Sequence, residues 1–482
     1  MAGLPPDVHY QSAVTTIAHK YNLPGVFYLD LWPAGCGQVV VVDPDVALHM
    51  TVTKNHPKHE AEKWFIDPLI GEGNIVTTEG PRWKYLHKML SPAFAIQHIS
   101  NMRPAIAEEL MEFRSILYSK ADTGEKFSLE EITLHSTFDV IGKATFGESL
   151  NAKSKGSAAL EHWEAMSRAF ATTRESYNVV RNFFAKRVVR AEGEKLDAVL
   201  AAMVKKRFEV LVQEKVDLSN RKGLGIMDLI LRDYMEDIRQ SGKQGLDPLF
   251  LETAITQVKT LLIAGTGTTS DVICYLMMML SVHPDVVRKL REEHDSIFTK
   301  GVEASYQMLR DNPYRLNRLE YTTNVIKEVL RFYPIGNTAR MEHPTEKFLS
   351  YQGHQYSTEG KMICPVQMSM HMNNDVFQDA KKFDPDRYAR EDFPRHAWRP
   401  FERGPRGCLG QPLAMDELKI VLLLTVRDFD FTCVDLKPRK IPRVGWTDWD
   451  LTFGDRAFQQ FVFEARPRDG MPMTVKRSTW LS

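Results

Sequence analysis

One cysteine in this sequence lies in a setting that favours reactivity. Cys408 belongs to the stretch FERGPRGCLG, which has glycines on both sides of the cysteine and an arginine, Arg406, two residues before it. The residues that follow, QPLAMDELKIVLLLTV, are amphipathic with a proline near the start, which predicts that a helix begins there. Free N–H groups at a helix N-terminus and the positive end of the helix dipole favour a thiolate over a thiol. The pattern therefore predicts a thiolate that could bind a metal.

Two interpretations of Cys408 are open on this evidence. The plainer one is a buried structural cysteine, because a free cysteine usually behaves as a small buried hydrophobe. The other is an axial ligand to heme iron. In that case the glycines would let the backbone approach a large flat group, Phe401 would offer an apolar face, and Arg406 would bind a heme propionate.

A family resemblance supports the second interpretation. Phe401, Gly404, Arg406, Cys408 and Gly410 match all five specified positions of Phe-x-x-Gly-x-Arg-x-Cys-x-Gly, the heme-binding loop of the cytochromes P-450. The chain resembles this family over nearly its whole length. The segments AWRPFERGPRGCLGQ and HMNNDVFQDAKKFDPDRY look like its eukaryotic, fungal members, which mostly serve secondary metabolism. The resemblance implies heme b with Cys408 as its axial thiolate, and Phe401, Arg406 and Gly410 at the cofactor.

A second motif lies in LLIAGTGTTSDVICYLMMML, whose apolar residues on nearly all sides predict a core helix. Its two glycines fit either close helix packing or the approach of a flat cofactor and dioxygen to the backbone. The family carries (Ala/Gly)-Gly-x-(Asp/Glu)-Thr-(Thr/Ser) here, so the resemblance makes Ala264, Gly267 and Thr268 the catalytic positions. Thr268 would hydrogen-bond the iron-bound oxygen. Gly267 stands where the family has an acid, so proton relay must use water or another residue, or the reaction must differ.

A third motif pairs a carboxylate with an arginine. Glu328 and Arg331 in NVIKEVLRFYP are three residues apart, which places them on one face of a predicted helix. Taken alone, a surface salt bridge worth only ~0.2–1 kcal/mol is the simpler interpretation. The family carries Glu-x-x-Arg at this place, and KKFDPDRY resembles its Phe-x-Pro-x-Arg segment. The resemblance implies that Arg387 joins the pair in a buried charge network that locks the Cys408 loop onto the helical core.

Three further residues are implied as ligands of the heme propionates. Trp83 in PRWKYLHKML matches the family's Trp-x-x-x-Arg helix, but His87 occupies the arginine position. Histidine and the indole N–H can both donate a hydrogen bond, although a surface histidine is an equally simple interpretation of His87. Arg340 is the third ligand by resemblance.

The substrate pocket is implied only by position in the family. It would draw on residues 67–78, 170–177, 263–264, 336–338 and 446–458. Their aromatic and apolar side chains imply a lipophilic substrate, although an ordinary core has the same composition.

Composition limits the classes of function. The chain has 482 residues, with 62 basic and 62 acidic side chains and no basic block, which argues against nucleic acid as the main partner. Five widely spaced cysteines argue against a disulfide framework or a zinc site and indicate a reducing compartment. Neither a run of ~18 unbroken apolar residues nor a signal peptide is apparent. The sequence as given predicts a soluble cytoplasmic chain, and the resemblance implies the cytosolic face of the endoplasmic reticulum membrane if a native anchor was removed.

The surrounding pattern predicts the elements that position these residues. Two β-rich runs, 25–32 and 37–45, predict a hairpin, with Asp43 capping a helix that starts at Pro44. Residues 67–78 are predicted as a loop, and residues 343–366 and 429–434 as β-rich. Helices are predicted at 81–90, 99–120, 129–146, 158–170, 176–189, 193–216, 226–235, 248–281, 284–296 and 318–332, with a linker at 239–247. The prediction is a mainly α protein with small β-sheets and the cytochrome P-450 fold. It is treated as one catalytic domain, 1–482, with a β-rich part at about 25–60, a helical body at about 81–335 and the heme-binding loop at 401–410.

The leading functional hypothesis is a heme-thiolate monooxygenase that oxidises a hydrophobic small molecule, such as a fungal secondary-metabolite intermediate. It would use O2 and electrons from NADPH through a separate NADPH–cytochrome P-450 reductase, with cytochrome b5 as a second candidate donor, and would act as a monomer. One rival is a heme-thiolate isomerase or dehydratase, or a peroxide-driven enzyme, which Gly267 favours and Thr268 opposes. The other is a non-catalytic heme sensor or carrier.

Overall fold

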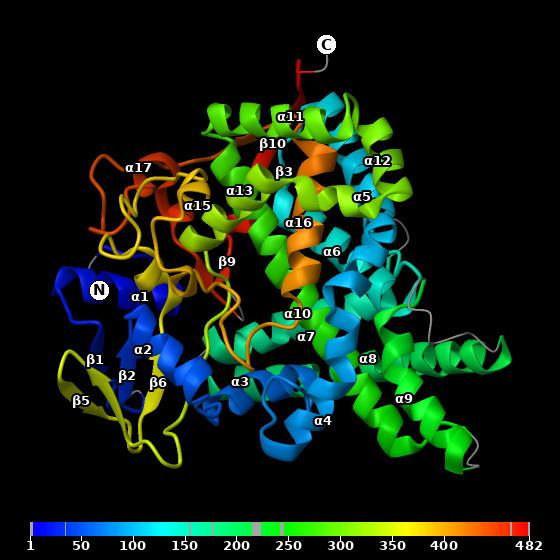
Figure 1. The fold of residues 1–482 in the computed structure, drawn as a ribbon, viewed down its shortest axis with the longest axis horizontal. Helices are drawn as coiled ribbons and strands as arrows, with labels where there is room; N and C mark the ends of the chain where they lie inside the picture. The colour runs from blue at the N-terminus through cyan, green and yellow to red at the C-terminus, as the bar shows by residue number, and fades with distance from the viewer. Residues whose placement is uncertain are drawn as a thin grey trace.

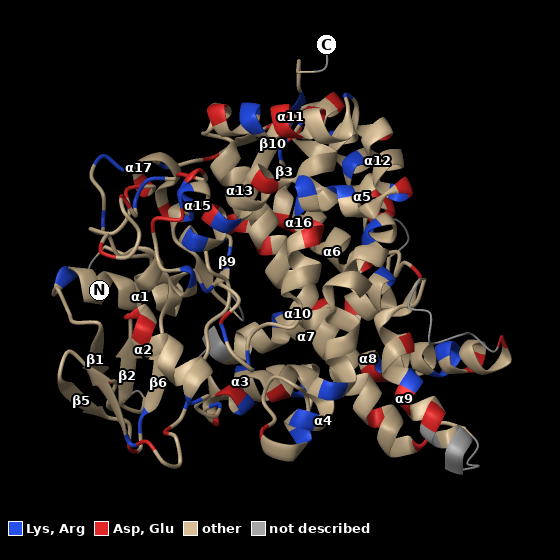
Figure 2. Ribbon diagram, in the orientation of Figure 1, with Lys and Arg blue, Asp and Glu red and all other residues tan. Residues whose placement is uncertain are grey.

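In the computed structural model of the protein, the described residues are 3–33, 35–153, 156–175, 178–214, 223–241, 245–462 and 465–480. A helical body occupies the right of Figure 1, and a β-rich part lies at the lower left. Basic and acidic residues are interspersed over the outer helices in Figure 2, as expected for a chain with no net charge.

The helices of the described chain carry most of its residues. They are α1 Tyr10–Lys20, α2 Pro44–Leu48, α3 Ala61–Ile70, α4 Gly80–Leu90, α5 Ile96–Thr123, α6 Leu129–Phe146, α7 Ala158–Glu175, α8 Val179–Gln213, α9 Ile226–Ser241, α10 Pro248–Leu280, α11 Pro284–Phe298, α12 Val302–Asp311, α13 Glu320–Phe332, α14 Gln367–His371, α15 Arg387–Arg390, α16 Gln411–Thr425 and α17 Asp450–Phe453. Shorter turns of π- or 3-10 helix are η1 His49–Thr53, η2 Ser91–Phe94, η3 Pro313–Arg318, η4 Arg395–Ala397, η5 Gly454–Ala457 and η6 Arg468–Gly470.

Four small sheets accompany these helices. The strands are β1 Val26–Leu29, β2 Gln38–Val41, β3 Phe127–Ser128, β4 Phe348–Tyr351, β5 His354–Ser357, β6 Met362–Pro365, β7 Phe429–Cys433, β8 Gln460–Phe461, β9 Ala465–Arg466 and β10 Pro472–Arg477. The predicted hairpin forms as the antiparallel pair β1–β2, and β6 adds to it in parallel with Val39 opposite Ile363. The other sheets have the orders β3-β10-β7, β4-β5 and β8-β9.

Helix α10 is the centre of the helical body. Its C-terminal half, from Thr269 to Leu280, is buried throughout, and it packs against α6, α8, α13 and α16. By length and composition it could cross a membrane, but 83% of its most apolar window is buried inside the protein. The apolar run therefore builds a core, because its side chains are already covered by other helices.

Local signals explain several element boundaries. Asp43 caps α2 as predicted, since its carboxylate accepts hydrogen bonds from the backbone N–H groups of Asp45 and Val46, both at 2.9 Å. Residues 67–78 are not all loop, because α3 continues to Ile70 and ends at Gly71, whose φ is +103°. That conformation suits glycine.

The predicted break between helices at 176–189 and 193–216 is wrong. Residues 179–213 form the single helix α8, with Gly193 inside it. A Cβ at Gly193 would lie 3.5 Å from Met166 Sδ of α7, so this glycine serves close helix packing rather than a turn. The predicted linker at 239–247 begins within α9, and residues 242–244 lie outside the described residues.

Candidate active site

The Cys408 loop is fixed by its own backbone. The Cys408 N–H donates to the Phe401 carbonyl at 2.9 Å, and the Gly407 N–H donates to the Gly404 carbonyl at 2.9 Å. Gly404 has a φ of +85°, and a Cβ there would collide with the Thr51 carbonyl. Both the tight turn and the close approach of η1 therefore require glycine at this position.

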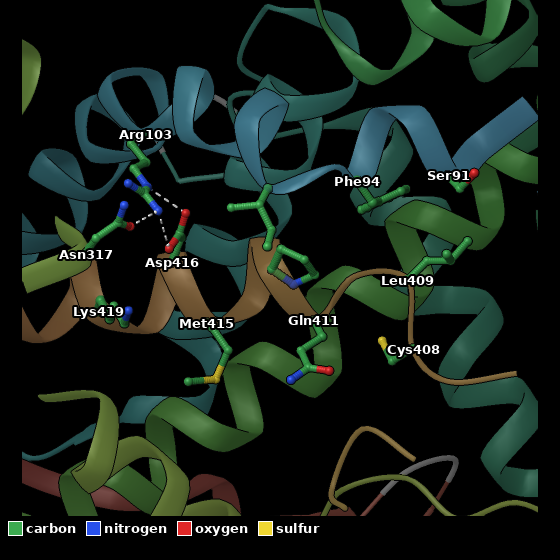
Figure 3. Close-up of a pocket in the computed structure, with 12 residues that line it drawn as sticks. Ser91, Phe94, Arg103, Asn317, Cys408, Leu409, Gln411, Met415, Asp416 and Lys419 are labelled. Carbon is green, nitrogen blue, oxygen red and sulfur yellow. Dashed lines mark hydrogen bonds and ion pairs between the residues drawn. The ribbon is translucent and has the colours of Figure 1, made fainter. Parts of the chain in front are cut away.

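The sulfur of Cys408 is accessible although protein surrounds it. The residue is exposed, and it lies on the loop that leads into α16 (Figure 3). Burial raises the pKa of its thiol, and backbone N–H groups of Gly410 and Gln411 at the helix start oppose this rise by hydrogen bonding to the sulfur. These N–H groups stabilise a thiolate. The arrangement suits a sulfur ligand to a metal that takes up the remaining charge.

Helix α10 presents two of the predicted catalytic residues to open space. Ala264 is exposed and Thr268 is half-buried, although their neighbours Ile263 and Thr269 are buried. The Thr268 hydroxyl donates to the Ala264 carbonyl at 2.7 Å. Gly267 is buried in the same turn and brings no carboxylate. Ala264 and Thr268 are thus accessible while the residues next to them on the helix are covered, so this turn borders an internal space.

Gly265, two residues before Gly267, has a packing role. A Cβ at Gly265 would lie 3.0 Å from the Ile141 side chain of α6, which is tighter than an ordinary contact. The Thr137 hydroxyl of α6 also donates to the Thr266 carbonyl of α10 at 3.0 Å. Close packing therefore accounts for Gly265.

The structure brings the three residues of the predicted charge network together. Arg331 forms a bidentate pair with Glu328, at 2.8 and 2.9 Å, and the Arg387 Nε donates to the same carboxylate at 3.1 Å. All three side chains are buried. The guanidinium groups also donate to backbone carbonyls, Arg331 to His371 at 2.8 Å and Arg387 to Gln378 at 2.8 Å.

This network reaches the Cys408 loop through His371. The ring accepts a hydrogen bond at Nε2 from the Arg399 N–H, at 3.2 Å. Arg399 is buried, donates to the Thr51 hydroxyl at 2.8 Å and pairs with Glu402 at the start of the loop. The charges of α13 are thus connected, residue by residue, to the segment that carries the cysteine.

Both arginines predicted as propionate ligands, Arg340 and Arg406, have donors left over in the described chain. Arg340 is fully buried, and its Nη1 donates to the His56 carbonyl at 2.9 Å, whereas Nε and Nη2 have no partner among the described residues. The Arg406 Nη2 donates to the carbonyls of Val76 and Thr78, at 3.0 and 2.8 Å, and its Nη1 is likewise unpaired within the described chain. Buried guanidinium donors without partners are costly, so they suit an anionic group such as a propionate.

Trp83 and His87 lie beside Arg406. The guanidinium lies 4.8 Å from the centre of the Trp83 ring, and the His87 ring lies 4.8 Å from the same indole. Burial lowers the pKa of His87, and so does the charge of Arg406. Burial also lowers the pKa of Arg406, to about 10. The four predicted propionate ligands thus include three that lie side by side, with a neutral histidine at the arginine position.

One cation of this cluster was missed by the sequence analysis. The Lys58 Nζ donates to the Thr338 hydroxyl at 2.7 Å and pairs with Glu62 at 2.9 Å. Burial lowers the pKa of Lys58, and the nearby charges of Arg340 and Arg406 lower it further. Lys58 lies opposite Arg340 in an isolated β-bridge. No motif marks this lysine, because only the tertiary pairing of two distant segments places it there.

Aromatic rings gather between α3, α7 and the C-terminal strands. Phe65 of α3 lies edge-on to Phe170 of α7, with ring centres 5.8 Å apart, and stacks on Phe461 of β8 at 6.0 Å. Only Phe170 belongs to the segments predicted for the substrate pocket. Phe65 and Phe461 lie just outside the predicted ranges 67–78 and 446–458. No signal at a single residue could have shown that these ranges should be extended to include them.

The comparisons with known proteins identify the family. The chain matches the family model described as cytochrome P-450 over residues 7–447, and it belongs to that family. Cytochrome P-450 monooxygenase polC of Polytolypa hystricis is 30% identical over 486 residues, which cover 98% of this chain and 85% of the relative. Cytochrome P-450 monooxygenase acrF of Aspergillus aculeatus is 27% identical and covers 98% of both chains. The crystal structure of the cytochrome P450DA heme domain has a TM-score of 0.75 at 19% identity, covering 99% of this chain and 94% of that one.

These findings confirm the predicted fold and the class of enzyme. The protein is a heme-thiolate monooxygenase of the fungal secondary-metabolism type, and its cofactor is heme bound through a cysteine thiolate. The isomerase, peroxide-driven and carrier alternatives are not favoured. The accessible Cys408 sulfur and the unpaired donors of Arg340 and Arg406 fit such a cofactor.

Proposed function

We propose that Cys408 is the axial ligand of the heme in this monooxygenase, and that residues 1–482 act as one catalytic domain. The observation that carries this is the accessible sulfur at the start of α16, which receives hydrogen bonds from the N–H groups of Gly410 and Gln411. Arg340 and Arg406, together with Lys58, Trp83 and His87 beside them, would hold the two propionates. Phe401 and Gly410 would border the ring near the sulfur.

A reduced-plus-carbon-monoxide difference spectrum tests the ligand. The parent chain should give the long-wavelength Soret band of thiolate ligation, and Cys408→Ala should lose it. Cys36→Ala is the matched control, because Cys36 is the other exposed cysteine of the described chain. A long-wavelength band that survives in Cys408→Ala would sink the assignment.

The heme, when bound, supplies the iron that activates O2, and the chain then has to deliver protons in a controlled way. We propose that Thr268 does this with water. Its hydroxyl donates to the Ala264 carbonyl, so its oxygen lone pairs are free to accept a hydrogen bond from a water molecule. Gly267 leaves that turn without a carboxylate, so water must take the place of the acid.

Coupling efficiency tests the role of Thr268. Thr268→Ala should consume NADPH with reductase present but divert most of its electrons to the reduction of O2 to hydrogen peroxide, whereas Thr268→Ser should restore product formation. Equal coupling in Thr268→Ala and the parent chain would overturn the proposal.

We propose a hydrophobic small molecule, a fungal secondary-metabolite intermediate, as the substrate. The rings of Phe65, Phe170 and Phe461 support this, since aromatic side chains on separate elements line lipophilic pockets. Screening apolar compounds for a shift of the heme Soret band would test it. A response only to polar, charged compounds would contradict it.

We propose that the reductase docks on the face around the Cys408 loop. A groove of about 560 Å³ lies there, lined by Ser91, Phe94, Ile96, Arg103, Asn317, Cys408, Leu409, Gln411, Pro412, Met415, Asp416 and Lys419 (Figure 3). Asp416 neutralises Arg103 at 2.6 Å, which leaves Lys419 as the cation without an opposite partner within 4.0 Å in the described chain. Lys419→Glu should raise the KM for reductase and leave peroxide-supported turnover unchanged. The same KM in both chains would contradict this.

We also propose that the enzyme works at the cytosolic face of the endoplasmic reticulum membrane. The first turns of α8 expose apolar residues at helical spacing: Val179, Val180, Phe183, Phe184 and Val188, at 80, 65, 56, 61 and 43%. Such a stripe suits insertion between lipid headgroups. Flotation with phospholipid vesicles should carry the parent chain upward and leave a Phe183→Ser, Phe184→Ser variant in solution. Equal flotation of both would exclude this surface.

A further inference from the structure

One side chain of the central helix holds the backbone of the 71–79 loop, which joins α3 to α4. Gln257 of α10 is fully buried. Its Nε2 donates to the Gly73 carbonyl at 3.1 Å, and its Oε1 accepts from the Ile75 N–H at 3.0 Å. A side-chain amide carries a donor and an acceptor, as a peptide group does. Gln257 therefore pairs with the loop much as a neighbouring strand would.

Asn74 makes the 71–79 loop rigid. This residue is also fully buried, and its Oδ1 accepts from the N–H groups of Val76 and Thr77, both at 3.0 Å. Its Nδ2 donates to the Asp67 carboxylate of α3 at 2.9 Å. One side chain thus ties the part of the loop that Gln257 holds to the part that follows, so a shift of the first part displaces the second.

The second part of the loop holds Arg406. The carbonyls of Val76 and Thr78 accept from its Nη2, at 3.0 and 2.8 Å. An Nη atom carries two hydrogens, so both are bonded and the plane of the guanidinium is fixed. The Glu79 carboxylate lies farther away, at 3.4 Å, and its side chain is 39% exposed. The Nη1 of Arg406 has no hydrogen-bond partner among the described residues, and the loop sets its direction.

We propose that Gln257 is a positioning residue for the heme: it fixes the 71–79 loop, and the loop aims Arg406 Nη1 at a propionate. This inference rests on the proposed role of Arg406 as a propionate ligand. Gln257 lies about two turns before Ala264 on α10. One helix would thus border the space where oxygen is activated and also orient a ligand at the edge of the cofactor.

Packing alone does not explain a glutamine at this position. Its neighbours on the buried side of α10, such as Val258 and Leu262, are apolar. A Cβ at Gly71 would lie 3.9 Å from Thr256, an ordinary contact distance, so the loop already packs against α10 one residue away. A buried amide is costly unless its donor and acceptor are bonded. The glutamine therefore serves the two hydrogen bonds to the loop rather than the contact.

A double-mutant cycle tests the proposal, with the rate of heme transfer from the loaded chain to apomyoglobin as the measurement. Gln257→Leu, which removes the amide, should raise this rate about ten-fold. In an Arg406→Ala background, the same substitution should change the rate by less than about two-fold, because the residue through which it acts is already gone.

Thr260→Val is the matched control on the same helix. Thr260 is buried, but its hydroxyl donates to the Thr256 carbonyl within α10, at 2.7 Å, and not to the loop. This substitution should leave the rate of heme transfer unchanged in both backgrounds. If Gln257→Leu does not fold, Gln257→Asn takes its place, since the shorter side chain stays polar but cannot span both loop groups.

The propionate bands of the resonance Raman spectrum give a readout that a purely structural role would not move. They should shift in Gln257→Leu and in Arg406→Ala, and they should stay in place in Thr260→Val. The spectra need no substrate and no reductase, so they are separate from turnover.

The possible failures are distinguishable. An equal rise in heme transfer on Gln257→Leu in both backgrounds would overturn the proposal, because Gln257 would then act without Arg406. Unchanged heme transfer in Gln257→Leu itself would also overturn it. If Arg406→Ala alone changes neither the rate nor the propionate bands, the proposed role of Arg406 fails, and this inference fails with it.

Discussion

The side of the pocket that carries Cys408 and the side that carries the aromatic cluster are held in different ways. Around Cys408, buried arginines such as Arg331 and Arg387 bind carboxylates and backbone carbonyls at fixed distances. On the other side, Phe65 and Phe170 touch through ring edges, and the neighbouring α8 exposes Phe183. Directional ion pairs define one geometry, whereas ring contacts tolerate several. The fixed geometry suits a cofactor that is bound in one position, and the tolerant ring contacts suit a substrate whose position can vary.

The largest loss of stability on the Cys408 side should follow from disruption of the buried charge network. Glu328→Gln removes the negative charge shared by Arg331 and Arg387 and leaves two buried cations without a carboxylate. We expect a loss of roughly 3–5 kcal/mol in the free energy of unfolding, with loss of bound heme. Denaturant titration and heme content measure this. Glu391→Gln, which opens the exposed pair with Arg395, should cost ~1 kcal/mol or less. Equal costs for the two variants would show that the network is no more important than a surface pair.

Removal of one propionate ligand should have the next largest effect. Arg340→Ala deletes a buried guanidinium with two unpaired donors. Heme affinity should fall by about 10–100-fold, in the range found for residues that support a metal site, and Arg340→Lys should recover part of it. Heme transfer to apomyoglobin gives the dissociation rate. An unchanged rate in Arg340→Ala would remove this residue from the propionate site.

Acid should weaken the Cys408 side through His371. Burial lowers the pKa of His371 to about 3, and the Arg331 charge contributes. In the unfolded chain His371 therefore takes up a proton near pH 6.5, whereas in the folded chain it stays neutral. Its contribution to the free energy of unfolding is complete above pH 6.5 and is lost as the pH falls toward 3. The slope is about 1.4 kcal/mol per pH unit. His371→Gln should flatten the fall in the thermal midpoint between pH 6.5 and 5. A parallel fall in both chains would assign the acid sensitivity to other groups.

The aromatic side should respond least in stability and most in selectivity. Phe65→Leu keeps an apolar side chain, so the free energy of unfolding should change by less than ~1.5 kcal/mol. The dissociation constant of an apolar ligand should change several-fold, because a ring contact to Phe170 or Phe461 is lost. Optical titration of the heme band measures it. A loss of heme in Phe65→Leu would mean that the two sides are not held independently.

The same difference explains how far sequence alone could go. Cys408, Thr268 and Arg387 are predicted as site residues because their motifs resemble those of the family, whereas spacing alone places only Glu328 and Arg331 on one helix face. The long helices could be predicted because apolar residues recur with helical periodicity. The aromatic cluster could not be outlined, since Phe65 and Phe461 become neighbours only after folding and look like ordinary core residues. The same holds for Lys58 opposite Arg340 and for the uninterrupted helix α8, where packing against Met166 overrides the usual effect of Gly193.

The parallel pairing of β2 with β6 has a consequence for synthesis on the ribosome. Val39 and Ile363 are partners, so the hairpin emerges roughly 320 residues before the strand that completes its sheet. At about 5–20 residues per second, the nascent chain keeps that apolar edge unpaired for tens of seconds. Unpaired strand edges recruit other chains, so this segment is where chaperone binding during translation should concentrate. The interval ends only when β6, about three quarters of the way along the 482 residues, has left the exit tunnel.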